Sequence, residues 1–99
     1  MLNVTKEKKG SDLLVALEGR LDTVTAPQFE SELKEILSGI TKLTIDAEKL
    51  EYVSSAGLRV LLSAHKTMSK QGSMVVKNLS EEVKEVFDIT GFSDILTIE

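Results

Sequence analysis

Two consecutive serines, Ser54 and Ser55, stand before Ala56, Gly57 and Leu58 at the expected start of a helix. Serine is a preferred helix N-cap, so one hydroxyl has a structural use in bonding the free N–H groups of the first turn. A second hydroxyl there would face solvent at the positive end of the helix. A phosphate is tolerated at such a place and adds about −1.5 to −2 charges. The residues alone leave two interpretations open: a helix N-cap followed by a glycine for close packing, or a serine that acts as a phosphorylation switch.

Residues for catalysis or metal binding are scarce. The chain has no cysteine, and its single histidine, His65, stands among apolar positions of a predicted helix, as expected for a partly buried helix residue. A phosphate-binding glycine loop, an HExxH zinc motif and a GxSxG nucleophile elbow are all missing from the sequence. We therefore expect a protein that is not an enzyme and that holds no metal or cofactor.

Composition narrows the class of protein further. The 99 residues are 41% hydrophobic, and the formal net charge is −4. Lysines and glutamates are interspersed, so no basic stripe favours nucleic-acid binding. No apolar run approaches the ~20 residues of a membrane span, and the N-terminus lacks a signal-peptide pattern. We expect one cytoplasmic domain over residues 1–99 with no membrane insertion.

Hydrophobic periodicity and capping residues predict an alternation of strands and helices. Thr25 and Gln28 have the spacing of a capping box, Ser54 or Ser55 begins a second helix that ends at Gly72, and Ser80 caps a third. The expected strands are 2–6, 13–19, 43–46, 73–77 and 95–98, and the expected helices follow Thr25, Ser54 or Ser55, and Ser80. The order ββαβαβαβ predicts an α/β fold, a mixed and mostly parallel sheet with packed helices.

Two predicted loops, 19–25 and 46–57, follow the carboxyl ends of strands, where functional groups gather in such sheets. Asp22 in the first loop would repel a phosphate on the second, or would act as a turn residue whose carboxylate bonds the backbone of the next loop, and both roles are compatible. Asp46 is expected to cap the loop that follows it.

Three stretches resemble the anti-sigma factor antagonist family, whose fold is the STAS domain. Residues 19–22 (GRLD) followed by 25–26 (TA) resemble its first loop and helix start, and residues 54–58 (SSAGL) resemble its phosphorylation loop. The pattern over 86–92 resembles its third helix and turn, so the similarity covers nearly all of the chain. Aligned on Gly57, the phosphorylated serine falls on Ser55.

The resemblance implies a partner-switching regulator. The unphosphorylated protein would bind an anti-sigma factor that is also a GHKL-type serine kinase, and a sigma factor would be released. Phosphorylation of Ser55 would end binding, and a metal-dependent serine phosphatase would reset the cycle. Ser54 stands where the family often has Asp, and leaves a second candidate hydroxyl. We expect a free monomer whose partner-binding residues are Asp22, Thr23, Tyr52, Ser54, Ala56, Gly57, Leu58 and Arg59.

Two other interpretations remain open from the sequence. STAS-type accessory subunits of multi-protein scaffolds or lipid-transport ATPases can retain a serine at the same place. A nucleotide-binding protein could use the same loops, although Arg20 and Arg59 are the only evident phosphate clamps.

Overall fold

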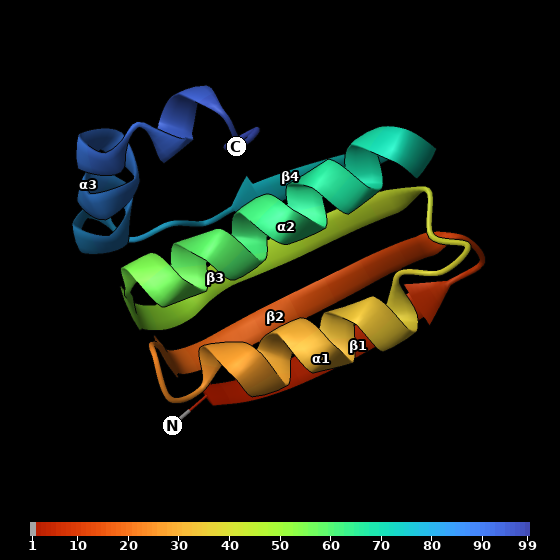
Figure 1. Cartoon of the computed structure of the whole chain (residues 1–99), viewed down its shortest axis with the longest axis horizontal. Helices are drawn as coiled ribbons and strands as arrows, with labels where there is room; N and C mark the ends of the chain where they lie inside the picture. The colour runs from red at the N-terminus through yellow and green to blue at the C-terminus, as the bar shows by residue number, and fades with distance from the viewer. Residues whose placement is uncertain (1) are drawn as a thin grey trace.

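One face of a four-stranded sheet carries two long helices, and a third helix lies at the end of the molecule (Figure 1). The computed structural model describes residues 2–99. Its elements are β1 (Leu2–Lys9), β2 (Asp12–Leu21), α1 (Ala26–Ile36), β3 (Lys42–Val53), α2 (Ser55–Gln71), β4 (Ser73–Lys77), α3 (Glu81–Thr90) and the short 3₁₀ helix η1 (Phe92–Asp94).

The strands lie in the order β1-β2-β3-β4. β1 and β2 form an antiparallel hairpin, whereas β2, β3 and β4 run parallel. Parallel neighbours require long crossovers, and α1 and α2 supply them. The predicted α/β class and the mixed, mostly parallel sheet are therefore confirmed.

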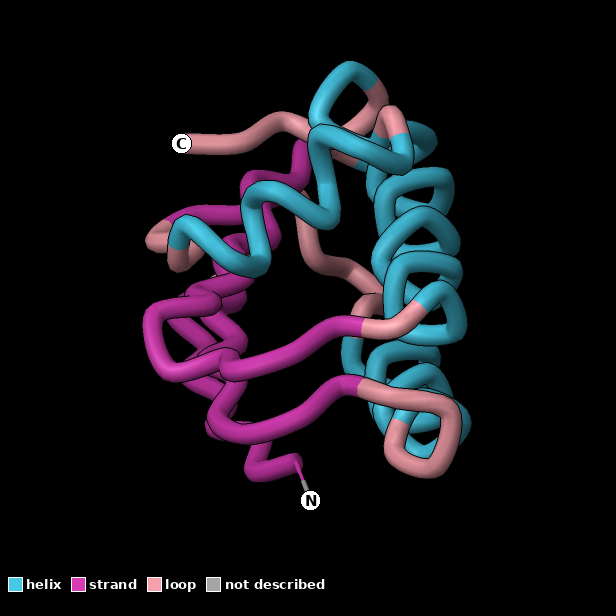
Figure 2. Tube along the Cα trace, turned by 90° about the vertical axis from the view of Figure 1, so that its left-hand side faces the viewer, coloured by secondary structure: helices cyan, strands magenta, loops and turns pink. Residues whose placement is uncertain are grey.

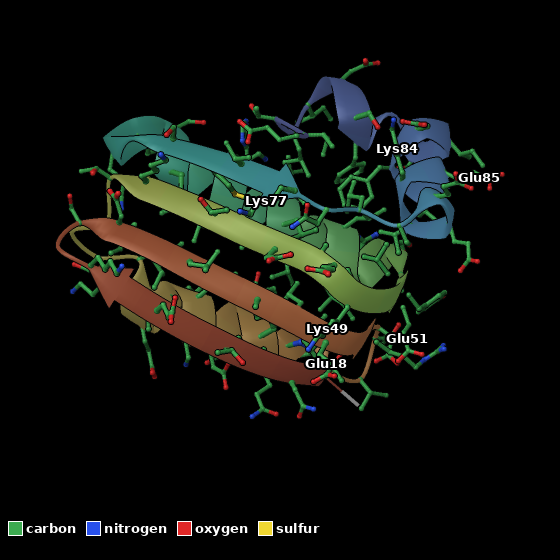
Figure 3. All side chains as sticks on the ribbon, turned by 180° about the vertical axis from the view of Figure 1, so that it is seen from behind. Glu18, Lys49, Glu51, Lys77, Lys84 and Glu85 are labelled. Carbon is green, nitrogen blue, oxygen red and sulfur yellow. The ribbon has the colours of Figure 1, made fainter. Side chains whose placement is uncertain are left out.

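The core lies between the sheet and the two long helices. Alternate residues of β2, such as Leu13, Val15 and Leu17, are buried on this side of the sheet. Phe29 of α1 and Met68 of α2 are buried against them. The buried side chains recur at every second residue of the strands and about every 3.6 residues of the helices, and the two sets pack against each other in one apolar layer. Figure 3 shows the opposite face, which no helix covers and from which charged side chains such as Glu18 and Lys49 project.

The third helix is bounded as its sequence predicts. The Ser80 hydroxyl accepts a hydrogen bond from the Val83 N–H at 3.2 Å, and Gly91 ends the helix with a left-handed φ of 82°. β4 pairs only with the first half of β3, and α3 packs against β3. The last predicted strand, 95–98, is reduced to a single parallel bridge between Val76 and Ile98.

The prediction that residues 46–57 form a loop is wrong. β3 continues through Asp46 to Val53, and only Ser54 separates it from α2. From the pair Ala16–Asp46 to Glu18–Lys49, β2 advances two residues and β3 three, so β3 carries a bulge. A second extra residue lies between the pairs Gly19–Leu50 and Arg20–Tyr52. The bulges bury every third residue, at Ala47, Leu50 and Val53, and hide the alternation that identifies a strand.

Candidate functional site

The ends of β2 and β3 bring residues 19–26 and 54–58 together. Leu21 pairs with Val53, and the Ser54 N–H donates to the Leu21 carbonyl at 2.9 Å. Figure 2 looks onto this end of the molecule, where the two connections lead side by side from strands to helices. The segment after Leu21 and the start of α2 therefore form one continuous surface.

Ser54 and Ser55 have different structural positions. Ser54 is the N-cap of α2, with extended backbone angles, and its hydroxyl oxygen accepts a hydrogen bond from the Gly57 N–H at 3.3 Å. Ser55 is the first residue of α2, is exposed, and its hydroxyl makes none of the hydrogen bonds found within residues 2–99. Asp is as good an N-cap as Ser, so Ser54 fills a role that the aspartate often found here in the family can also fill.

Replacing Ser54 by alanine is expected to lower the free energy of unfolding by about 1 kcal/mol, because the Gly57 N–H loses its acceptor. Ser54→Asp retains a capping oxygen and is expected to stay near wild-type stability. Ser55→Ala removes no hydrogen bond and serves as the matched control. Urea denaturation of the three variants measures the effect, and equal stabilities of Ser54→Ala and Ser55→Ala would contradict the assignment of the cap.

Gly57 is required by packing. An added Cβ would lie 2.7 Å from Cγ of Leu21, 2.8 Å from the Leu21 carbonyl oxygen and 3.0 Å from Val53 Cγ2. These distances are well inside van der Waals contact, so only glycine lets the first turn of α2 approach the strand ends this closely. Leu58 is also buried, with 2% of its surface exposed. Both residues were predicted to contact a partner, but they lie in the interior and can only set the position of the surface above them.

Asp22 organises the loop between β2 and α1. Its Oδ1 accepts hydrogen bonds from the Val24 N–H at 3.0 Å and the Thr25 N–H at 3.1 Å. The Thr25 N–H is the main cause that holds the pKa of the Asp22 carboxyl below its usual value of 3.8. Because folding lowers this pKa, the ionised carboxylate stabilises the folded protein at neutral pH. That contribution is lost as the pH falls through the lowered pKa and the carboxylate takes up a proton.

The capping box predicted for Thr25 is wrong. The Thr25 side chain does not cap α1. Its hydroxyl instead donates to the Arg20 carbonyl at 2.9 Å and accepts from the Asp22 N–H at 2.9 Å. Asp22 does act as a turn residue, but within residues 2–99 its carboxylate bonds the backbone of its own loop and not, as was expected, that of the next loop.

Two exposed residues at this end of the molecule, Arg20 and Val24, were not among the predicted partner-binding residues. The Arg20 guanidinium lies over the Tyr52 ring, 4.4 Å from its centroid, and its Nε lies 3.8 Å from Oδ2 of Asp22. Val24 at the tip of the loop is 85% exposed. Arg20 stands opposite Tyr52 only through the bulged pairing of β2 with β3, which no local pattern reveals. No sequence pattern over residues 23–25 predicts that the Val24 side chain is exposed.

The predicted partner-binding residues therefore divide by exposure. Thr23, Tyr52 and Arg59 are exposed, Asp22, Ser54 and Ala56 are half-buried, and Gly57 and Leu58 are buried. The predicted phosphate acceptor, Ser55, is exposed. Within residues 2–99 no three His, Asp or Glu side chains are grouped as metal ligands, and no helix of this part of the chain is long and apolar enough to cross a membrane. The site therefore presents one exposed hydroxyl, that of Ser55, at the start of a helix.

The sequence of this chain is similar to those of known proteins. The sequence profile described as STAS domain matches residues 3–99. The anti-sigma-B factor antagonist of Bacillus subtilis is 34% identical over 98 residues, which span 98% of this chain and 90% of the relative. The BtrV protein of Bordetella bronchiseptica is 35% identical over 99 residues, spanning 98% of this chain and 85% of the relative.

Solved structures share the fold. A crystal structure of an anti-sigma factor antagonist from Mycobacterium paratuberculosis superposes with a TM-score of 0.89 at 21% identity, covering 99% of this chain and 85% of that one. The anti-sigma factor antagonist SpoIIAA in its unphosphorylated form gives 0.76 at 18% identity, covering 98% and 87%. The profile match over nearly the whole chain and the sequence identity to full-length relatives agree with the fold: this chain belongs to the STAS domain family.

Proposed function

We propose that this protein is an anti-sigma factor antagonist that works by partner switching. Unphosphorylated, it binds an anti-sigma factor that is a GHKL-type serine kinase, and a sigma factor is released. Phosphorylation of Ser55 ends the association, and a metal-dependent serine phosphatase restores it. The protein turns over no substrate itself, acts in the cytoplasm as one domain, and is a monomer when free.

One observation carries this proposal: the hydroxyl of Ser55 is exposed and uncommitted, whereas that of Ser54 is engaged as the N-cap. A kinase must reach the hydroxyl, and the fold must survive its modification. Both conditions hold for Ser55 and neither holds well for Ser54. The names of the relatives from Bacillus subtilis and Listeria monocytogenes, both anti-sigma-B factor antagonists, support the function.

The site also supports a phosphate. Ser55 and Ala56 begin α2, and their N–H groups make none of the backbone hydrogen bonds found outside helices and strands within residues 2–99. These groups and the helix dipole favour a negative charge. The SpoIIAA fold, which this chain resembles with TM-scores of 0.76 and 0.75, has been solved in an unphosphorylated and a phosphorylated form.

The surface around Ser55 explains how a phosphate would end binding. Val24 and Tyr52 offer exposed apolar area on the two segments that meet near Ser55, and Thr23 and Arg59 add exposed polar groups to the same segments. A partner that covers this surface would remove Ser55 from water. A dianion placed in such a desolvated contact is costly, and the Asp22 carboxylate on the adjoining loop adds like-charge repulsion.

The test is to incubate the protein with ATP and each GHKL-type kinase of the same genome, and to locate phosphate by intact-mass and peptide mass spectrometry. We expect one phosphate on Ser55, none in Ser55→Ala, and normal phosphorylation in Ser54→Asp, which keeps the cap but lacks the second hydroxyl. Phosphorylation should weaken kinase binding by at least about 100-fold, the effect of an uncompensated charge in an interface.

The opposite outcome has a clear meaning. Absence of phosphate with every kinase, together with stable binding to a membrane ATPase or a scaffold, would refute partner switching and favour an accessory subunit. The same fold does occur within a larger transport protein, murine Slc26a9, where it matches 14% of that chain with a TM-score of 0.70. Phosphate on Ser54 instead of Ser55 would overturn the assignment of the acceptor.

A further inference from the structure

One exposed arginine lies a single helical turn beyond Ser55. Arg59 follows Ser55 by four residues in the continuous helix α2, and both are exposed. Residues four apart on a helix share one face, with Cβ atoms about 5–6 Å apart. The pair also has the favourable order, with the group that would carry negative charge on the N-terminal side. A phosphate on Ser55 is therefore within reach of the Arg59 guanidinium.

Arg59 is free to take such a partner. It contributes to neither of the two ion pairs found within residues 2–99, Lys6–Glu32 and Arg20–Asp22. Arg20, the other arginine of this end of the molecule, is already held between the Tyr52 ring and the Asp22 carboxylate. Of the two arginines, only Arg59 can bind a new anion without giving up an existing contact.

The Asp22 carboxylate also affects the direction in which a phosphate on Ser55 would point. Asp22 follows Leu21, whose carbonyl bonds the Ser54 N–H, so the loop that carries Asp22 adjoins the start of α2. Arg59 lies one helical turn beyond Ser55 along α2. A phosphate on Ser55 would be repelled by the Asp22 carboxylate and attracted by the Arg59 guanidinium, and both effects favour pairing with Arg59.

We propose that Arg59 is a positioning residue for the phosphorylated state, pairing with the phosphate on Ser55 and holding it along α2, away from Asp22. The inference rests on the proposed function, because it concerns how the phosphate of that switch is presented. Guanidinium can bind phosphate through two parallel N–H bonds, so the pair favours one orientation of the phosphate. The phosphorylated state then favours one arrangement of charge on the surface that the kinase would cover.

The test uses the full chain with phosphoserine inserted genetically at position 55, so that no kinase is needed. The second ionisation of the phosphate is followed by ³¹P NMR in this protein and in the same protein with Arg59→Gln, Arg59→Lys or Lys66→Gln. Lys66 is the matched control, because it is exposed and lies about 16 Å from Ser55 along α2. This distance exceeds the screening length of about 8–10 Å at ordinary salt. A neighbouring cation favours the dianion, so its removal raises the phosphate pKa.

We expect Arg59→Gln to raise the phosphate pKa by roughly 0.3 unit, Arg59→Lys to raise it less, and Lys66→Gln to leave it unchanged. The Arg59 Nε–H resonance should also move when residue 55 changes from serine to phosphoserine. An equal phosphate pKa with and without Arg59, or an unmoved Arg59 resonance, would overturn the pairing. Failure of kinases to modify Ser55 is a separate result, which would count against the proposed function and leave the measured pairing intact.

Discussion

Replacing Gly72 by alanine is expected to lower the free energy of unfolding by about 3 kcal/mol and the thermal midpoint by roughly 15 °C. Gly72 follows α2, and a Cβ there would overlap the carbonyl group of Thr41 at the start of β3. The same carbonyl accepts the Ser73 N–H at 2.9 Å. Relief of the overlap must therefore separate β4 from β3 at their first pair, Lys42–Ser73.

A second set of contacts holds the end of α2 in place, so the backbone near Gly72 cannot easily move to relieve the overlap. The Gln71 side-chain amide donates to the carbonyls of Leu37 and Ile40, both at 2.6 Å. Gly39→Ala is the matched control, because a Cβ at Gly39 meets nothing within 4 Å and only its left-handed φ of 80° is unfavourable. That variant should lose about 1 kcal/mol. A Gly72→Ala protein as stable as Gly39→Ala, measured by thermal and urea denaturation, would contradict the predicted overlap.

Replacing Gly57 by alanine is expected to destabilise the fold by about 2 kcal/mol and to displace the site as well. The new Cβ would press on Leu21, which is fully buried, and push the first turn of α2 away from the end of β2. Overpacking costs about 1–3 kcal/mol, and the contact with a backbone carbonyl places this case at the upper end. The roughly 1 kcal/mol by which alanine favours a helix over glycine reduces the net loss to about 2 kcal/mol. The Ser54–Leu21 hydrogen bond would lengthen, and Ser55 would move with the turn.

The two glycine variants separate stability from site geometry. Both are compared at a temperature where each is fully folded, and the rate of Ser55 phosphorylation is measured. Gly57→Ala should be phosphorylated at least about 10-fold more slowly, because small displacements of a reacting group cost large factors in rate. Gly72→Ala, altered at the far end of α2, should react at the wild-type rate. Normal phosphorylation of Gly57→Ala would show that the close packing at Gly57 serves the fold alone.

Several features that depend on one helical turn, or on one run of alternating apolar and polar residues, were predicted correctly from the sequence. Ser80 and Gly91 bound α3 where expected, because a cap bonds groups only three residues away. β4 was predicted at its full length, 73–77, since its buried Met74 and Val76 alternate with more exposed neighbours. The candidate acceptor was narrowed to Ser54 and Ser55 for the same reason, as both belong to the start of a single helix.

What depends on the pairing of distant segments was decided only by the tertiary structure. The two bulges in β3 exist relative to β2, some 30 residues earlier, and they replace alternation by burial at every third residue. That register places Arg20 on Tyr52, and it sets Leu21 against Gly57 so that only glycine fits. The local sequence therefore determined the helices, most strands and the two candidate serines, whereas cross-strand register determined how closely the strand ends approach each other.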